Sequence, residues 1–104
     1  MIMRSWRGRA ATQERAHEYA AHLAQDVFPR LREIDGHRGA WLLRRHVADG
    51  VEVLVLTAWE SMAAIRAFAG DDPARAVVEP PALAALADTD ATVAHYEVVL
   101  APDG

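Results

Sequence analysis

The most distinctive hydrophobic pattern is the run of residues 51–59, which is apolar at both odd and even positions. Its Val and Thr residues favour a strand, because a branched Cβ suits a pleated surface. A strand that is apolar on both faces must be covered on both sides. Helices of the same chain can cover one face, but 104 residues offer no obvious second cover.

Two segments have the three- and four-residue apolar spacing of an amphipathic helix. The first spans residues 13–34, and Pro29 is expected to kink it or divide it in two. Gly36 is predicted as its left-handed cap. The second helix spans residues 62–69 behind an N-cap at Ser61.

The remaining segments complete the predicted order of elements. Strands are expected over residues 2–8, 39–47 and 92–100, before a tail at 101–104. The Glu79-Pro80-Pro81 segment predicts extended backbone, and residues 82–87 can form one or two helical turns.

The Asp49-Gly50 pair is typical of a two-residue type I′ hairpin turn, which sets the register of the flanking strands. Counting outward from that loop divides the side chains between the two faces. One face carries Trp41, Leu43, Leu54 and Leu56, and the other carries Leu42, Arg44, Val53, Val55, Thr57 and Trp59.

The order βαββαβ predicts a single α+β domain over residues 1–104, with a ferredoxin-like four-stranded antiparallel sheet. Both helices are expected on one face, which leaves the other face bare and apolar. A second copy packing sheet against sheet is the simplest cover, and two-fold symmetry is common. We therefore expect a homodimer in which two sheets form a barrel.

Composition excludes several classes of function. The net charge is -4, so the chain lacks the excess of positive charge that is typical of nucleic-acid-binding domains. Cysteine is absent, which removes disulfides, thiolate catalysis and Cys-ligated metals. The N-terminus does not resemble a signal peptide, and no apolar run approaches ~20 residues. The expectation is a cytoplasmic protein with no nucleic-acid or membrane partner.

Several segments resemble the antibiotic biosynthesis monooxygenase family of dimeric α+β barrels, and the likeness covers nearly the whole chain. They are Gly36-His37-Arg38-Gly39, Leu56-Thr57-Ala58-Trp59-Glu60-Ser61, Ala63-Ala64-Ile65-Arg66-Ala67-Phe68, Gly70-Asp71-Asp72-Pro73 and His95-Tyr96-Glu97-Val98.

The resemblance implies a cofactor-independent monooxygenase that binds a hydrophobic aromatic or polyketide-type molecule between helices and sheet. It also leaves open a non-catalytic ligand-binding or stress-response barrel, and a cyclase or isomerase that uses His and Tyr for proton transfer. Haem degradation is not expected. Haem-degrading relatives use an asparagine, a tryptophan and an iron-ligating histidine, whereas this chain has no Asn and aligns Phe68 and Val78 with the last two.

The candidate catalytic residues are His95, Tyr19 and His17, which could supply a base and an oxyanion donor. His95 shares a strand face with Glu97, about 7 Å along the strand, and a nearby carboxylate would raise its pKa. Tyr19 adjoins the apolar stripe of the first helix, while His22 is expected on its solvated side.

The candidate substrate-binding residues are Trp6, Trp59, Phe68, Arg44 and Glu79. Trp59 and Trp41 are expected on opposite sheet faces. Arg44 is the charged member of an apolar face and is expected to need a partner, which Glu52, an acid of a partner chain or an anionic substrate could supply. No spacing of His, Asp and Glu predicts a metal site, and no cofactor is expected.

Overall fold

The computed structural model describes residues 1–102 and is built on an antiparallel sheet centred on β1 (Ile2–Ala10). On one side of β1 lie β3 (Gly50–Trp59) and then β2 (His37–Val47), and on the other side β1 pairs with β4 (Asp88–Thr89) and β5 (Ala94–Glu97). The predicted α+β ferredoxin-like arrangement is confirmed, with the short β4 as an additional strand.

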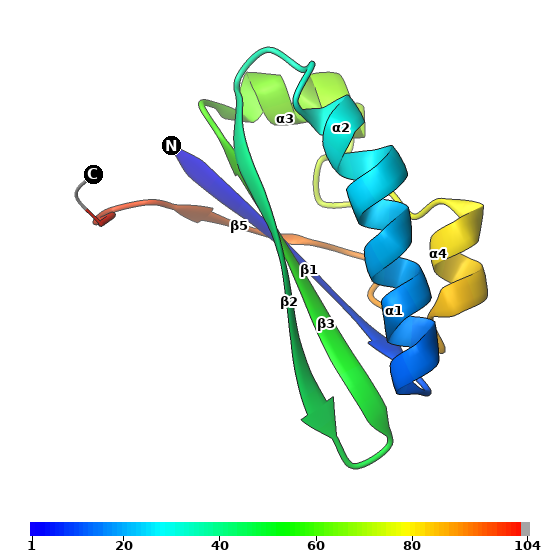
Figure 1. Ribbon diagram of the computed structural model, residues 1–104. Coiled ribbons are helices and arrows are strands. Elements are labelled where there is room, and N and C mark those ends of the chain that lie inside the picture. Colours follow the sequence, from blue (N-terminus) through cyan, green and yellow to red (C-terminus); the bar gives the residue numbers. More distant parts are fainter. Residues whose placement is uncertain (103–104) are drawn as a thin grey trace.

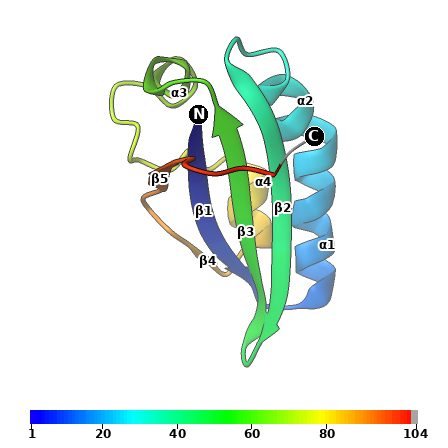
Figure 2. The same ribbon diagram turned by 90° about the vertical axis from the view of Figure 1, so that its left-hand side faces the viewer.

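The helices gather on one face of this sheet (Figure 1). The layer contains α1 (Gln13–His22), the π-helical segment η1 (Leu23–Val27), α2 (Phe28–Leu31) and α4 (Pro80–Ala85), while α3 (Met62–Ala69) lies at one end. No helix covers the opposite face of the sheet in the described part of the chain, as Figure 2 shows.

The first helical segment is divided near Pro29, as predicted. Pro29 occupies the first turn of α2, where a missing N–H costs little. The π-helical segment before it was not predicted. After α2 the chain turns at Gly36, which has φ +88°, and the Gly36 carbonyl accepts a 2.8 Å hydrogen bond from the Glu60 N–H.

The predicted register of the hairpin was wrong by two residues. Val47 pairs with Gly50, so Ala48 and Asp49 form the loop instead of Asp49 and Gly50. The prediction of a type I′ turn is also wrong. Such a turn needs positive φ at both loop residues, and among the described residues only glycines have it. At Gly50 a Cβ would lie 2.1 Å from the Ala10 carbonyl oxygen, so this glycine permits the close approach of β1.

A two-residue shift keeps every side chain on its predicted face, since side chains alternate along a strand. Trp59 is completely buried beneath the helices, whereas Trp41 is 48% exposed on the bare face. The prediction that these tryptophans lie on opposite faces is therefore confirmed.

Two further predicted boundaries were wrong. Pro80 and Pro81 form the first turn of α4 instead of extended backbone; Glu79 alone is extended, as its N-cap. The last strand is shorter than residues 92–100, because β5 ends at Glu97. Asp103 and Gly104, the end of the predicted tail, lie outside the described residues. No helix over residues 1–102 is long and apolar enough to cross a membrane.

Candidate functional site

A cavity of about 560 Å³ lies between the inner face of the sheet and the helical layer. Its walls are largely apolar and include Leu23, Val27, Phe28, Leu31, Val55 and Phe68. Ligand pockets of ~300–1,000 Å³ usually combine such walls with a few polar groups that fix orientation. Here the polar groups come from β1, α1, α2, β3 and the loop before α4.

Arg4 is the most buried charged side chain that lines the cavity, with 5% of its surface exposed. Nη1 donates to the Pro73 carbonyl oxygen at 2.5 Å, and Nη2 donates to the Arg75 carbonyl oxygen at 3.2 Å. Its guanidinium carbon lies 5.9 Å from the ring centre of Phe68, in a cation–π arrangement. Burial lowers the pKa of Arg4 from its ordinary value.

His95 lies beside Arg4 on the neighbouring strand, with its Nε2 atom 2.9 Å from Arg4 Nη1. A guanidinium can only donate, so Nε2 accepts and the imidazole is neutral in this contact. Burial, followed by the charge of Arg4, lowers the pKa of His95. The expectation that a carboxylate from Glu97 raises this pKa was therefore wrong.

Tyr19 projects from α1 into the cavity wall and is 3% exposed. Its ring lies 6.3 Å from the ring of Trp6, which also lines the cavity and donates from Nε1 to the Asp90 carbonyl oxygen at 2.7 Å. Burial raises the pKa of Tyr19, so its phenol stays protonated. The structure thus brings two predicted candidates, Tyr19 and Trp6, to one site.

His22 also lines the cavity, and its expected position on the solvated side of the helix was wrong. Its side chain is only 8% exposed, and Nδ1 lies 3.3 Å from the Asp26 carboxylate. His17 is exposed on α1 and is not part of the cavity lining. Of the two helical histidines, the structure therefore brings His22 to Tyr19.

Trp59 supports the site from within the core. Its Nε1 donates to the Thr57 hydroxyl at 2.8 Å, and its ring stacks on Phe68 with centroids 5.5 Å apart. Phe68 reaches the cavity, as predicted, and so does Val78. Trp59 is not itself among the lining residues.

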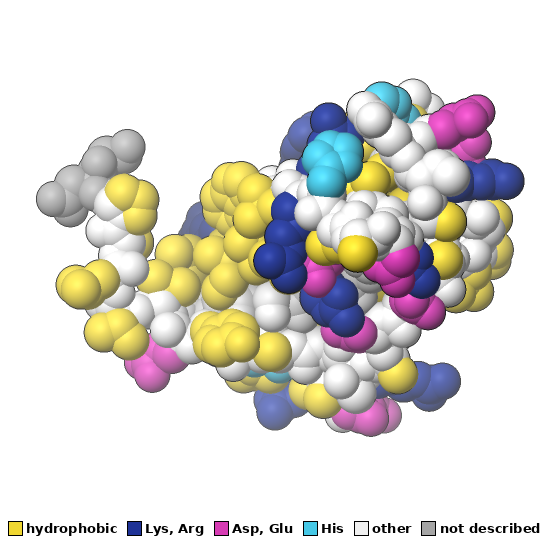
Figure 3. Space-filling model, turned by 90° about the horizontal axis from the view of Figure 1, so that it is seen from below, with side chains coloured by type: hydrophobic (Ala, Val, Ile, Leu, Met, Phe, Trp, Pro, Cys, Tyr) yellow, Lys and Arg dark blue, Asp and Glu magenta, His cyan; other side chains and the backbone are white. Residues whose placement is uncertain are grey.

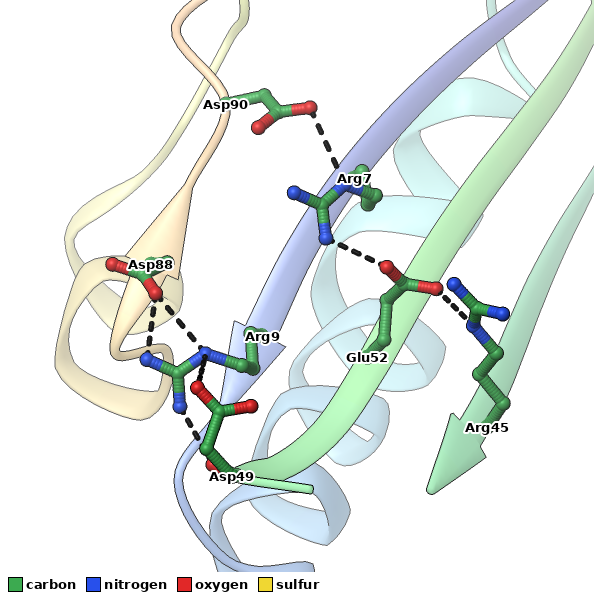
Figure 4. Close-up of polar contacts among 7 residues, drawn as sticks. All are labelled: Arg7, Arg9, Arg45, Asp49, Glu52, Asp88 and Asp90. Atoms are coloured by element: carbon green, nitrogen blue, oxygen red, sulfur yellow. Dashed lines mark hydrogen bonds and ion pairs between the residues drawn. The ribbon is translucent and has the colours of Figure 1, made fainter. Parts of the chain in front are cut away.

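The predicted charged contacts are arranged differently. Arg44 is exposed on the edge strand β2 and does not line the cavity. The carboxylate of Glu52, its expected partner, instead binds Arg7 and Arg45 on the outer face (Figure 4). Glu79 does line the cavity and forms a 2.5 Å ion pair with Arg30 of α2.

Sequence reasoning missed Arg4 as a cavity residue, although one signal was available. Arg4 lies opposite Thr57 in the β1–β3 register and so shares the inner face with Trp59. A charged residue at such a position marks a site for inspection. The described part of the chain contains no group of three or more His, Cys, Asp or Glu residues that could hold a metal ion.

Comparison with known proteins gives a consistent family likeness. Residues 2–80 match the family model of antibiotic biosynthesis monooxygenases. No curated protein matches the chain.

Three solved structures are similar in fold. A candidate antibiotic biosynthesis monooxygenase from Deinococcus radiodurans is 18% identical, with TM-score 0.66 and coverage of 99% of this chain and 97% of that one. The haem-degrading protein MhuD from Mycobacterium tuberculosis, solved with two haems in its active site, is 22% identical, with TM-score 0.65 and coverage of 99% and 100%. A Streptomyces coelicolor monooxygenase in complex with nanaomycin D is 19% identical, with TM-score 0.59 and coverage of 98% and 92%.

Proposed function

The chain belongs to the antibiotic biosynthesis monooxygenase family, and we propose that it is a cofactor-independent monooxygenase acting on a hydrophobic aromatic or polyketide-type substrate. The observation that carries the proposal is the largely apolar cavity of about 560 Å³, which suits a fused ring system. The nanaomycin D bound to the Streptomyces coelicolor monooxygenase supports the same class of ligand here.

Proton removal from the substrate needs a base at the cavity, and we assign this role to His22. Asp26 contacts its Nδ1 and orients the ring, which leaves Nε2 to accept a proton. Tyr19, three residues earlier in the chain, has a protonated phenol that can donate to a developing oxyanion. In this proposal His22 acts as the base in place of His17, which is exposed, and of His95, whose Nε2 already accepts a hydrogen bond from Arg4.

The proposed reaction uses molecular oxygen as its oxidant. A substrate methylene C–H proton moves to His22, and the electron pair left on carbon adds to O₂. His22 returns its proton to the resulting peroxide. Loss of water then leaves one oxygen atom on the carbon as a carbonyl and releases the other as water.

Oxygen uptake with an anthrone substrate, without added flavin or metal, tests this function. The wild type should consume one O₂ per substrate molecule. His22→Gln should slow turnover by about 10²–10⁴-fold, the usual contribution of a general base. His17→Gln is the matched control and should keep the wild-type rate. Oxygen uptake no faster than in protein-free buffer, over a panel of anthrones and dihydroquinones, would refute the proposal.

The same Tyr19 and His22 also suit a cyclase or isomerase, because proton transfer between carbon and oxygen needs no O₂. Turnover that persists under argon would favour that activity. Specific binding without turnover in air or argon would favour a non-catalytic ligand-binding barrel.

Haem chemistry does not fit the cavity residues well. Val78, aligned with the iron-ligating histidine of haem-degrading relatives, lies in the cavity wall and has no ligating atom. Haem therefore has no part in the proposed reaction. Titration of haem into the protein should give no saturable 1:1 Soret shift, and a stoichiometric shift lost in His22→Ala would overturn this prediction.

We also propose that the protein acts as a homodimer through the outer face of the sheet. Trp41 and Leu43 are 48% and 45% exposed there, and Tyr96 of β5 is 60% exposed. Hydrophobic side chains gather on this side of the molecule, next to the C-terminal segment (Figure 3). Covering them with a second copy removes apolar surface from water.

A further inference from the structure

Arg4 carries a buried positive charge for which the described residues supply no negative partner. No carboxylate of residues 1–102 forms an ion pair with Arg4. Its three hydrogen-bond partners are two backbone carbonyls and the neutral imidazole of His95. These dipoles solvate the guanidinium but leave its charge uncompensated, which is costly in a protein interior.

The other charges of the cavity do not supply the missing anion. Glu79 is the acidic residue among the lining side chains, and it is paired with Arg30. His22 is engaged with Asp26. The net formal charge of the lining is therefore positive, and Arg4 is its source.

The guanidinium also has unused donors. Of its five N–H bonds, the two on Nη1 are directed to Pro73 and His95, and one on Nη2 is directed to Arg75. The Nε–H and the second N–H of Nη2 have no partner among the described residues. Guanidinium N–H donors form strong charge-assisted hydrogen bonds with carboxylate oxygens, and either free donor can also bind a phenolate oxygen.

We propose that Arg4 is the anion-recognition residue of the cavity, and that the ligand is an apolar ring system bearing one anionic oxygen group, a carboxylate or an ionised phenol. This inference rests on the proposed function for the apolar part of the ligand. The anionic group binds the free donors of Arg4, while the rings contact the apolar wall that includes Phe68.

His95 is the positioning residue in this arrangement. Its Nε2 and the carbonyls of Pro73 and Arg75 hold the guanidinium on three sides. Arg4 therefore needs little reorganisation to bind an anion, and pre-organised donors bind with a smaller entropic cost.

Binding can be tested with wild-type protein, without any turnover. The probes are 1-naphthoate, 1-naphthol and the neutral 1-naphthamide, followed by isothermal titration calorimetry under argon. At pH 7.5, 1-naphthoate should bind about ten- to a hundredfold more tightly than 1-naphthamide, the range for hydrogen bonds to charged groups. For 1-naphthol, binding should tighten as the pH rises through the pKa of the phenol if the ionised phenol is recognised.

Variants show which residue is responsible for the preference for the anionic probe. Arg4→Met should abolish the preference for 1-naphthoate over 1-naphthamide, and Arg4→Lys should retain part of it. Arg66→Met removes one exposed charge on α3 and should leave the preference unchanged. Circular dichroism establishes that each variant is folded; if Arg4→Met is not, the comparison of probes in the wild type decides alone.

The possible failures are distinguishable. Equal affinity for 1-naphthoate and 1-naphthamide, or binding of neither, overturns the role of Arg4 as an anion receptor. A strong preference for 1-naphthoate without oxygen uptake on any substrate supports anion recognition and refutes the monooxygenase proposal.

Discussion

Arg4 Nη1 and His95 Nε2 lie 2.9 Å apart on neighbouring strands, and this contact requires a neutral imidazole. Their register pairing in β1 and β5 keeps the two side chains on the inner face of the sheet. The contact also links the C-terminal strand to the loop at Pro73, because Arg4 binds both.

This contact predicts acid sensitivity that depends on His95. Burial and the charge of Arg4 lower the pKa of folded His95, whereas the unfolded chain retains a pKa of about 6.5. Below about pH 6.5 the unfolded state therefore binds a proton that the folded state resists. The free energy of unfolding consequently decreases as the pH is lowered. Urea unfolding at pH 7.5, 6.5 and 5.5 should show a flatter pH dependence in His95→Gln than in the wild type.

His37 contributes in the same direction, since burial and Arg32 lower its pKa. The pH profile of the double variant His37→Gln/His95→Gln should be flatter than that of either single variant. A His95→Gln profile parallel to that of the wild type would contradict the assignment.

A second prediction concerns Gly36, where the chain packs closely against α3. A non-glycine residue at φ +88° costs about 1–3 kcal/mol. A Cβ at Gly36 would also lie 2.7 Å from the Ala64 Cβ, which adds about 1–3 kcal/mol of overpacking. Gly36→Ala should therefore destabilise the protein more than Gly70→Ala, where φ is +90° but no atom lies within 4 Å.

A double-mutant cycle separates the two costs. Ala64→Gly should relieve the contact but not the backbone strain, so its effect should be more favourable in the Gly36→Ala background than in the wild type. Additive effects in urea unfolding would show that the two Cβ positions do not clash.

The sequence predicted the faces of the sheet better than its loops, for a physical reason. Side chains alternate between the two faces along a strand, so the predicted grouping of residues by face survives a two-residue shift. The loop position depends on the approach of the Ala10 backbone to Gly50, a contact between distant segments. Local turn preference at Asp49-Gly50 does not contain that information.

The same limit explains why two cavity residues were misplaced or missed. His22 is the last residue of α1, three positions after Tyr19, and its burial comes from the cavity walls built by segments distant in sequence. Arg4 acquires its partners from residues 73, 75 and 95, none of which is near it in sequence. Tyr19, by contrast, lies within regular helix and was placed correctly beside the apolar stripe.

A third prediction compares the tryptophans of the two sheet faces. Trp59 is fully buried, stacks on Phe68 and donates to Thr57, so Trp59→Ala should cost about 3–5 kcal/mol in urea unfolding. Trp41→Ala should cost less than about 1 kcal/mol in dilute protein, where the exposed face is uncovered. Equal decreases in the free energy of unfolding for the two variants would show that Trp41 is buried in the folded protein at that concentration.

The fourth prediction tests the proposed dimer by introducing a charge on its expected interface. Leu43 is 45% exposed in the single chain, next to Leu54 in the β2–β3 register. A carboxylate there would be buried without a partner if two sheets pack together, which is strongly unfavourable. Sedimentation at micromolar concentration should therefore show a dimer for the wild type and a monomer for Leu43→Glu.

Ala63→Glu provides the matched control, because it introduces the same charge at an exposed position of α3, away from the outer sheet face. It should sediment as the wild type does. Val99 and Leu100, after β5, are also exposed, and the C-terminal segment crosses the helix-free side of the sheet in Figure 2. Val99→Asp should therefore weaken the dimer, by no more than Leu43→Glu does. A wild-type protein that sediments as a monomer at all concentrations would refute packing through this face.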